Sequence, residues 1–210
     1  MSAGPAVAQR KKVGVLVSGR GSNLQALLDA CADPTFPAEI VLVISNVPGV
    51  LALERAEKAG VATTVIPHRD YPSREAFDAA MDLVLRAAGI EIVCLAGFMR
   101  LLSSGFVAGW QGAMLNIHPS LLPSFKGLHT HRQALEAGVK LHGCTVHLVT
   151  PDLDDGPILA QSAVPVLDDD DEASLAARVL EQEHVVYPLA LRLLAEGRVT
   201  VQGNRALIRG

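Results

Sequence analysis

The chain has 210 residues, 50% hydrophobic and 19% charged, as in a folded globular protein rather than a disordered one. Its formal net charge of −4 argues against a nucleic-acid-binding protein, because neutralising many phosphates requires a basic face. No apolar run approaches the roughly 18 residues of a membrane span, and residues 1–12 lack the apolar core of a signal peptide. The three cysteines lie far apart, as is usual in a reducing compartment. We expect a cytoplasmic protein without a membrane or nucleic-acid partner.

In the first half of the chain, short β-branched runs alternate with helical patterns. Strands are predicted at residues 13–17, 39–45, 61–66 and 91–96. Helices are predicted at residues 22–31 and 51–59, and a third, capped by Ser73, continues to about residue 88. Gly60 and Gly89 follow the second and third helices, where a left-handed residue often ends a helix. The alternation predicts a mostly parallel, twisted sheet with helices on both faces, Rossmann-like in its N-terminal half.

The second half of the chain has a different pattern. A short strand at residues 113–117 precedes a proline-bounded loop at 118–123 and a helix near 130–137. Strands at 144–149 and 158–164, joined by the turn 150–157, are spaced as an antiparallel pair. The last helix begins inside the acidic run 168–172, which would cap it, and continues to about residue 195 with a bend near Pro188. We therefore predict a flexible arm at residues 1–12 and a single α/β domain at residues 13–210, with antiparallel strands in its C-terminal half.

A glycine-rich turn, Ser-Gly-Arg-Gly-Ser-Asn at residues 18–23, lies between the first strand and the first helix. It is not a P-loop, because no Gly-Lys-Ser/Thr follows, and Leu24 occupies the third glycine position of a dinucleotide fingerprint. The turn alone is equally typical of a plain turn in which Ser22 caps the helix. Ser22 and Asn23 beside Gly21 favour a monophosphate site at the helix N-terminus.

The segment 116–123, Asn-Ile-His-Pro-Ser-Leu-Leu-Pro, combines an amide and an imidazole. Residues two apart in an extended segment share a face, so Asn116 and His118 would offer an oxyanion donor and a proton carrier near one point. Asp154, in a Gly- and Pro-rich turn, could reach the same point and favour the charged imidazole. Taken singly, each residue also has an ordinary interpretation: a turn former, a satisfied polar group, and an aspartate that caps its own turn.

Four motifs in this order resemble the phosphoribosylglycinamide formyltransferase family, also called glycinamide ribonucleotide transformylase. They are the turn at 18–23, Leu-Ala-Gly-Phe-Met-Arg at 95–100, the segment 116–123, and Asp-Asp-Gly-Pro at 154–157, and the resemblance covers about residues 13–198. It implies transfer of the formyl group of 10-formyltetrahydrofolate to the amine of 5'-phosphoribosylglycinamide, in de novo purine biosynthesis. The products would be formylglycinamide ribonucleotide and tetrahydrofolate, and the reaction would need no metal.

The resemblance also implies roles for individual residues. Asn116 and protonated His118 would stabilise the oxyanion, His118 would protonate the leaving folate nitrogen, and Asp154 would keep that histidine charged. The expected ribonucleotide-binding residues are Gly21, Ser22, Asn23 and Glu183. The expected folate-binding residues are Arg74, Met99, Arg100, Leu101, Leu102 and Asn116. The chain differs at one position from a member of the family in which two glycines follow the aspartate that matches Asp154, because Asp155 stands here in place of the first glycine.

Other functions remain open from the sequence. Methionyl-tRNA formyltransferase and formyltetrahydrofolate hydrolase share the Asn-x-His motif and the aspartate, but each carries an extra domain for which we expect no room here. A non-catalytic nucleotide or folate sensor could share the same fold. Four histidines, His129, His131, His142 and His147, raise the possibility of a metal hydrolase, although their spacing supplies two ligands at most. The partners expected are small molecules, and the protein would be a monomer or a homodimer.

Overall fold

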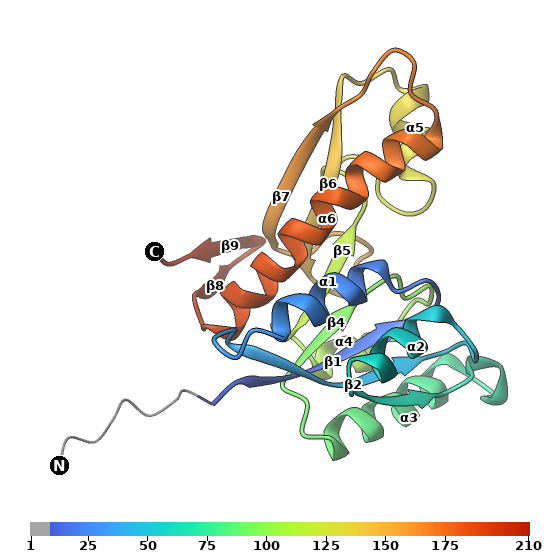
Figure 1. The fold of residues 1–210 in the computed structure, drawn as a ribbon, viewed down its shortest axis with the longest axis vertical. Coiled ribbons are helices and arrows are strands. Elements are labelled where there is room, and N and C mark those ends of the chain that lie inside the picture. The colour runs from blue at the N-terminus through green and yellow to red at the C-terminus, as the bar shows by residue number, and fades with distance from the viewer. Residues whose placement is uncertain (1–8) are drawn as a thin grey trace.

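The structure is a computed structural model that describes residues 9–210. Its strands form one nine-stranded sheet in the order β3-β2-β1-β4-β5-β6-β7-β9-β8 (Figure 1). The strands are β1 (Lys11–Val17), β2 (Ala38–Ser45), β3 (Ala62–Val65), β4 (Ile92–Leu95), β5 (Met114–His118), β6 (Leu141–Leu148), β7 (Ile158–Pro165), β8 (Val199–Gln202) and β9 (Arg205–Ile208). The helices are α1 (Ser22–Cys31), α2 (Leu51–Lys58), α3 (Arg74–Ala87), α4 (Ser104–Gly109), α5 (Thr130–Glu136) and α6 (Glu172–Ala195), with a 3-10 turn at His68–Asp70.

The predicted arm lies largely outside the described residues. Lys11 and Lys12, which the prediction assigned to it, already pair with Ala38 and Glu39 in the sheet. The strand was predicted from its apolar run, and the charged side chains of Lys11 and Lys12 do not belong to that run. Strand β1 thus begins two residues before the predicted start of the domain.

Strands β3, β2, β1, β4 and β5 are parallel to one another, as predicted. Both faces of β1, β2 and β4 are covered, which explains why these three strands have almost continuous apolar runs rather than alternating ones. One core cluster joins one sheet face to α1, α2 and α6, and a second joins the opposite face to α3 and α4. The fold class predicted from the strand–helix alternation is confirmed.

The sheet becomes antiparallel in its C-terminal half, also as predicted. β6 pairs antiparallel with both β5 and β7, and these long strands extend beside α6 (Figure 1). The hairpin of β8 and β9 joins the sheet edge through a single residue pair, Ile158 and Arg205. This hairpin and α4 were not predicted, because four-residue strands and a six-residue helix with two glycines give weak periodic signals.

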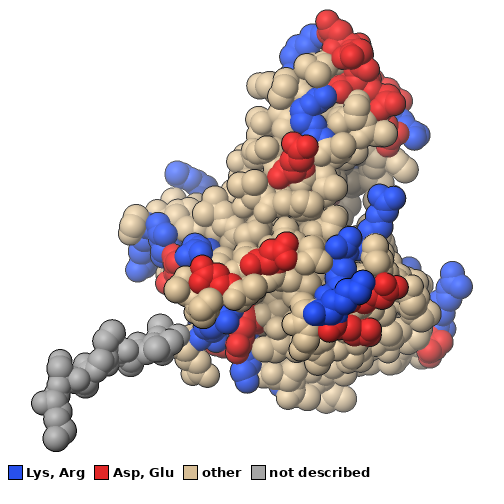
Figure 2. All heavy atoms as spheres, viewed as in Figure 1, with Lys and Arg blue, Asp and Glu red and all other residues tan. Residues whose placement is uncertain are grey.

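The acidic run caps α6, as predicted. The Asp171 carboxylate accepts a hydrogen bond from the backbone N–H of Ser174, and the Ser174 hydroxyl oxygen accepts one from the backbone N–H of Asp171. Asp170 accepts two hydrogen bonds from Arg178, which hold the pKa of this carboxyl well below its ordinary value. Figure 2 shows acidic side chains gathered with basic ones over this end of the molecule. α6 then continues as an uninterrupted helix through Pro188.

None of the helices within residues 9–210 combines the length and the apolar character needed to cross a bilayer.

Candidate active site

The candidate residues gather where the parallel strands end. The chain leaves β1 towards β2 on one side and returns to β4 on the other side, so β1 and β4 form a topological switch point. The glycine-rich turn follows β1, residues 97–102 follow β4, and Asn116 and His118 end β5. In parallel sheets, the crevice at such a point is the usual place for ligands.

His118 is held between two oxygen acceptors. Its side chain is almost fully buried, with Nε2 2.9 Å from the carbonyl oxygen of Phe125 and Nδ1 3.5 Å from Oδ2 of Asp154. A carbonyl oxygen only accepts hydrogen bonds, so Nε2 must carry a hydrogen. A charged imidazolium would therefore have an acceptor on each ring nitrogen.

Asp154 does not cap its own turn. Its Oδ2 accepts a hydrogen bond of 2.9 Å from the backbone N–H of Gly127, which is 27 residues away in the sequence. The residue adopts the left-handed conformation, with φ of 50°, and its side chain is 8% exposed. The ordinary interpretation of this aspartate thus disagrees with the structure, because the carboxylate is aimed at His118 and at a second loop.

His147 is the polar residue of this site that the sequence analysis missed. It lies opposite Asn116 in the pairing of β5 with β6, and its Nε2 is 3.2 Å from Nδ2 of Asn116 and 3.8 Å from Oδ1 of Asp154. Its Nδ1 faces the carbonyl of Leu148 at 2.9 Å, so Nδ1 donates and Nε2 accepts. Burial lowers the pKa of His147, which favours this neutral form. His147 consequently orients the Asn116 amide and leaves the second Nδ2 hydrogen for another acceptor.

No signal in the sequence distinguishes His147 from the other histidines, because the register between β5 and β6 is a tertiary property. His131 and His142 contact each other, with Nδ1 of the former 3.2 Å from Nε2 of the latter. Burial and the neighbouring imidazole lower the pKa of His142 to about 4. Across residues 9–210, no three His, Cys, Asp or Glu side chains form a group that could hold a metal ion.

The glycine-rich turn opens α1 with free donors. Gly21, not Ser22, is the N-cap residue, with φ of 72° and no side-chain capping bond. A Cβ at Gly21 would lie 2.7 Å from that of Ala52, so the turn requires glycine for close packing as well as for its backbone angle. The interpretation of Ser22 as a plain helix cap is therefore wrong, and its hydroxyl stands in the first turn beside unpaired backbone N–H groups.

Asn23 and Glu183 lie together although 160 residues separate them in the sequence. Nδ2 of Asn23 donates to Oε2 of Glu183 at 2.6 Å, and Oδ1 of Asn23 is buried without a partner in the described chain. Glu183 is only 7% exposed. Its pKa is raised by burial, an effect that the hydrogen bond from Asn23 opposes in part. A buried carboxylate of this kind suits a ligand with a donor or a cation.

The expected folate-binding residues form a more open group. Met99 and Leu101 are 66% and 59% exposed, whereas Leu102 is half-buried. The backbone N–H of Met99 donates to the Ser18 hydroxyl at 2.8 Å, which joins this loop to the end of β1. Arg100 is exposed, as is Arg74 at the start of α3.

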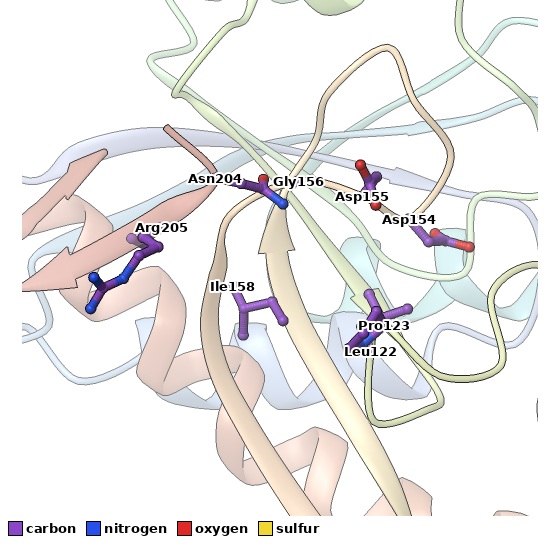
Figure 3. Close-up of a pocket in the computed structure, with 9 residues that line it drawn as sticks. Leu122, Pro123, Asp154, Asp155, Gly156, Ile158, Asn204 and Arg205 are labelled. Carbon is purple, nitrogen blue, oxygen red and sulfur yellow. The ribbon is translucent and has the colours of Figure 1, made fainter. Parts of the chain in front are cut away.

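A cavity of about 280 Å³ lies on the side of the 150–157 loop that faces the C-terminal hairpin. Figure 3 shows it between Leu122 and Pro123 on one side and Asn204 and Arg205 on the other, with Ile158 between them. Of the expected catalytic and binding residues, the cavity borders only Asp154, whose carboxylate points away from Ile158 and Arg205. The cavity therefore lies behind the expected site.

Most of this chain aligns with the sequences of known proteins. Residues 11–191 match the formyl transferase family. Phosphoribosylglycinamide formyltransferase of Escherichia coli is 47% identical over 196 residues, which are 93% of this chain and 92% of its own length. The human trifunctional purine biosynthetic protein adenosine-3 is 54% identical over 93% of this chain. The chain spans only 14–19% of the length of such trifunctional relatives.

Solved structures agree with the sequence matches. Glycinamide ribonucleotide transformylase 1 from Symbiobacterium toebii superposes with a TM-score of 0.94 at 49% identity, covering 96% of this chain and 95% of its own. A formyltetrahydrofolate deformylase from Pseudomonas syringae reaches a TM-score of 0.90 at 29% identity, over 97% of this chain and 67% of its own. The family resemblance inferred from the four motifs is confirmed. The chain belongs to the formyl transferase family and has the fold of its phosphoribosylglycinamide formyltransferases.

Proposed function

We propose that this chain transfers the formyl group of 10-formyltetrahydrofolate to the amine of 5'-phosphoribosylglycinamide. The observation that carries the proposal is the junction of Asn116, His118 and Asp154 beside a helix N-terminus with free donors, at the switch point of the sheet. Full-length relatives named for this reaction range from 33% to 54% identity, and the enzymes from Escherichia coli and Symbiobacterium toebii are 47% and 49% identical, whereas the deformylase is 29% identical. Hydrolysis of the formyl group by water is accordingly the less favoured reaction.

The reaction begins when the amine lone pair forms a bond to the formyl carbon and the carbonyl π electrons move to oxygen. The free Nδ2 hydrogen of Asn116 stabilises this oxyanion, because His147 already holds the amide in place. The Phe125 carbonyl fixes the ring of His118 through Nε2, so Nδ1 is the nitrogen that exchanges a proton. An electron pair of the oxyanion then re-forms the carbonyl while the bond from carbon to the folate nitrogen breaks, the pair of that bond remains on nitrogen, and His118 protonates the nitrogen. The proton released by the amine passes to Asp154 and returns to His118.

The two substrates would occupy opposite sides of the switch point. The phosphate of the ribonucleotide binds at Gly21 and Ser22, where backbone donors and the helix dipole favour an anion. The buried carboxylate of Glu183, oriented by Asn23, accepts from the glycinamide end of the substrate. That contact also offsets the unfavourable burial of the carboxylate.

The folate would lie along the loop after β4. The exposed apolar side chains of Met99 and Leu101, together with Leu102, flank the pterin, and Arg74 and Arg100 supply positive charge for its carboxylates. These residues provide apolar walls and cations, which is what a flat heterocycle with an acidic tail requires. No metal has a role in this reaction.

One assay tests the proposal. The protein is mixed with 10-formyltetrahydrofolate, with and without 5'-phosphoribosylglycinamide, and tetrahydrofolate formation is followed. Rapid formation that depends on the ribonucleotide, together with a formylated product, supports transfer. Equal rates in both mixtures would indicate hydrolysis, and absence of tetrahydrofolate from both would indicate a non-catalytic binding protein.

A further inference from the structure

The structure gives a partner to Asp155, the residue that stands where the resemblance implies a glycine. Its carboxylate forms an ion pair with the ammonium group of Lys126. We propose that Lys126 and Asp155 are a positioning pair that holds the 119–129 loop against the 150–157 loop and thereby keeps His118 aligned for proton transfer. This inference rests on the proposed function, since it assigns the pair a role in that reaction.

The sequence neighbours of Lys126 contact the proposed catalytic side chains directly. The carbonyl of Phe125 accepts from Nε2 of His118, and the N–H of Gly127 donates to Oδ2 of Asp154, both at 2.9 Å. A shift of residue 126 would therefore move both contacts at once. Orientation errors of about 1 Å can cost on the order of a hundredfold in rate, so small shifts of this loop matter.

Few polar contacts join the two loops. Among residues 9–210, only two hydrogen bonds or ion pairs link residues 119–129 to residues 150–157: Gly127 to Asp154, and Lys126 to Asp155. The first uses the carboxylate that the reaction itself requires. The ion pair is thus the one polar link between these loops that does not engage a proposed catalytic group.

The backbone of both loops needs such a link. Phe125 and Asp154 have φ of 55° and 50°, in the left-handed region that residues with a Cβ rarely adopt. Conformations of this kind persist when surrounding contacts over-determine them. The ends of the 119–129 loop are held by other hydrogen bonds, such as those from Ser120 to Ser124 and from Gln133 of α5 to Leu128. Its middle faces the other loop, where the ion pair lies.

Because the ion pair is exposed, its effect on turnover can be measured separately from its effect on folding stability. The side chains of Lys126 and Asp155 are 36% and 47% exposed, and ion pairs this exposed contribute little to folding stability. Breaking the pair should leave the melting temperature nearly unchanged. A loss of turnover without a loss of stability would then report the alignment of His118.

The experiment compares four variants with the wild type: Lys126→Met, Asp155→Asn, the charge-exchanged double variant Lys126→Asp/Asp155→Lys, and Lys126→Arg. Single-turnover rates and both KM values are measured at low and high salt, with melting temperatures. The first two variants should lose about two- to five-fold in rate, the factor that an exposed ion pair is worth, with both KM values within about twofold. The exchange and the Lys126→Arg variant should restore the rate. High salt should slow the wild type towards the two single variants.

Lys140→Met is the matched control, because it breaks another exposed pair, with Asp168, far along the sheet. It should behave as the wild type in every assay. Wild-type rates in Lys126→Met and Asp155→Asn, or a failure of the exchanged variant to recover although it melts normally, would overturn the positioning role. An inactive wild type would instead overturn the proposed function itself.

Discussion

Gly156→Ala is the change that tests most directly whether the 150–157 loop positions a catalytic group. Gly156 follows the two aspartates of this loop and packs against the end of β6. A Cβ at this position would lie 1.7 Å from the carbonyl oxygen of Leu148, where real contacts essentially never fall below 3.0 Å. The same oxygen accepts the hydrogen bond from Nδ1 of His147. The substitution should therefore displace Asp154, which lies two residues earlier in the same loop. It should also displace His147, which is hydrogen-bonded to the Leu148 carbonyl.

The size of the effect follows from the distance. The loop or the carbonyl must move by at least the difference between 3.0 and 1.7 Å, which is about 1.3 Å. A displacement of about 1 Å at a catalytic group costs on the order of a hundredfold in rate. Forcing an extra methyl into a packed site typically costs about 1–3 kcal/mol of stability. We expect kcat to fall at least about a hundredfold, while ribonucleotide binding at Gly21 and Ser22 changes little.

Single-turnover rates, both KM values and the melting temperature are the measurements. Gly105→Ala is the control, because a Cβ there meets no atom within 4 Å and the residue lies inside α4. Alanine should stabilise that helix by about 0.5–1 kcal/mol and leave turnover unchanged. A folded Gly156→Ala enzyme with wild-type turnover would refute the reasoning, because it would mean that the loop can shift without displacing a group that the reaction needs.

Three further changes test other parts of the site. Asn116→Ala should raise the reaction barrier by about 2.7–4 kcal/mol, as for other oxyanion donors, without unfolding the protein. Single-turnover kinetics would measure the barrier, and circular dichroism would check that the variant is folded. Ser22→Asp should raise the KM for the ribonucleotide through repulsion of the phosphate, and an equal rise in the KM for folate would mean that the turn binds the other ligand. Glu183→Gln should weaken ribonucleotide binding but stabilise the free protein above the ordinary carboxyl pKa of 4.5. The folded state of the wild type holds its Glu183 proton more tightly than the unfolded state, so its stability should fall as the pH rises from about 4.5 through the raised pKa. Thermal unfolding between pH 4 and 7 should show this slope in the wild type and not in the variant.

Local signals were sufficient for most of the fold. The apolar runs, the glycines after α2 and α3, and the Ser73 cap depend on residues close together in sequence, and each was predicted correctly. The start of β1 and the C-terminal hairpin were not, because Lys11 and Lys12 carry charges and the hairpin strands are short. The start of β1 owes its structure to pairing with β2, and the two hairpin strands owe theirs to pairing with each other, rather than to their own sequence patterns.

The shared face of Asn116 and His118 was predictable, because side-chain alternation along a strand is a local rule. Asp154 was also expected beside His118, but the partner of Asn116 was not predictable. Which residue of β6 stands opposite Asn116 depends on the register of an antiparallel pair whose strands are joined by more than twenty residues, so His147 gave no sign of its place.

The burial of Glu183 is also not predictable from local sequence, and the reason is electrostatic as well as geometric. The family resemblance implied that Glu183 binds the ribonucleotide, but the helical pattern alone gives no sign of this. Only the packing of α6 against α1 buries the carboxylate beside Asn23. Burial of a carboxylate with one hydrogen-bond donor is unfavourable in the free protein, which is why its pKa is raised. The burial becomes favourable when a ligand supplies further donors, so the carboxylate is a feature that the bound state explains better than the free fold does. A sequence records the residue but not the desolvation, and the desolvation is what supports the proposal that Glu183 binds the ribonucleotide.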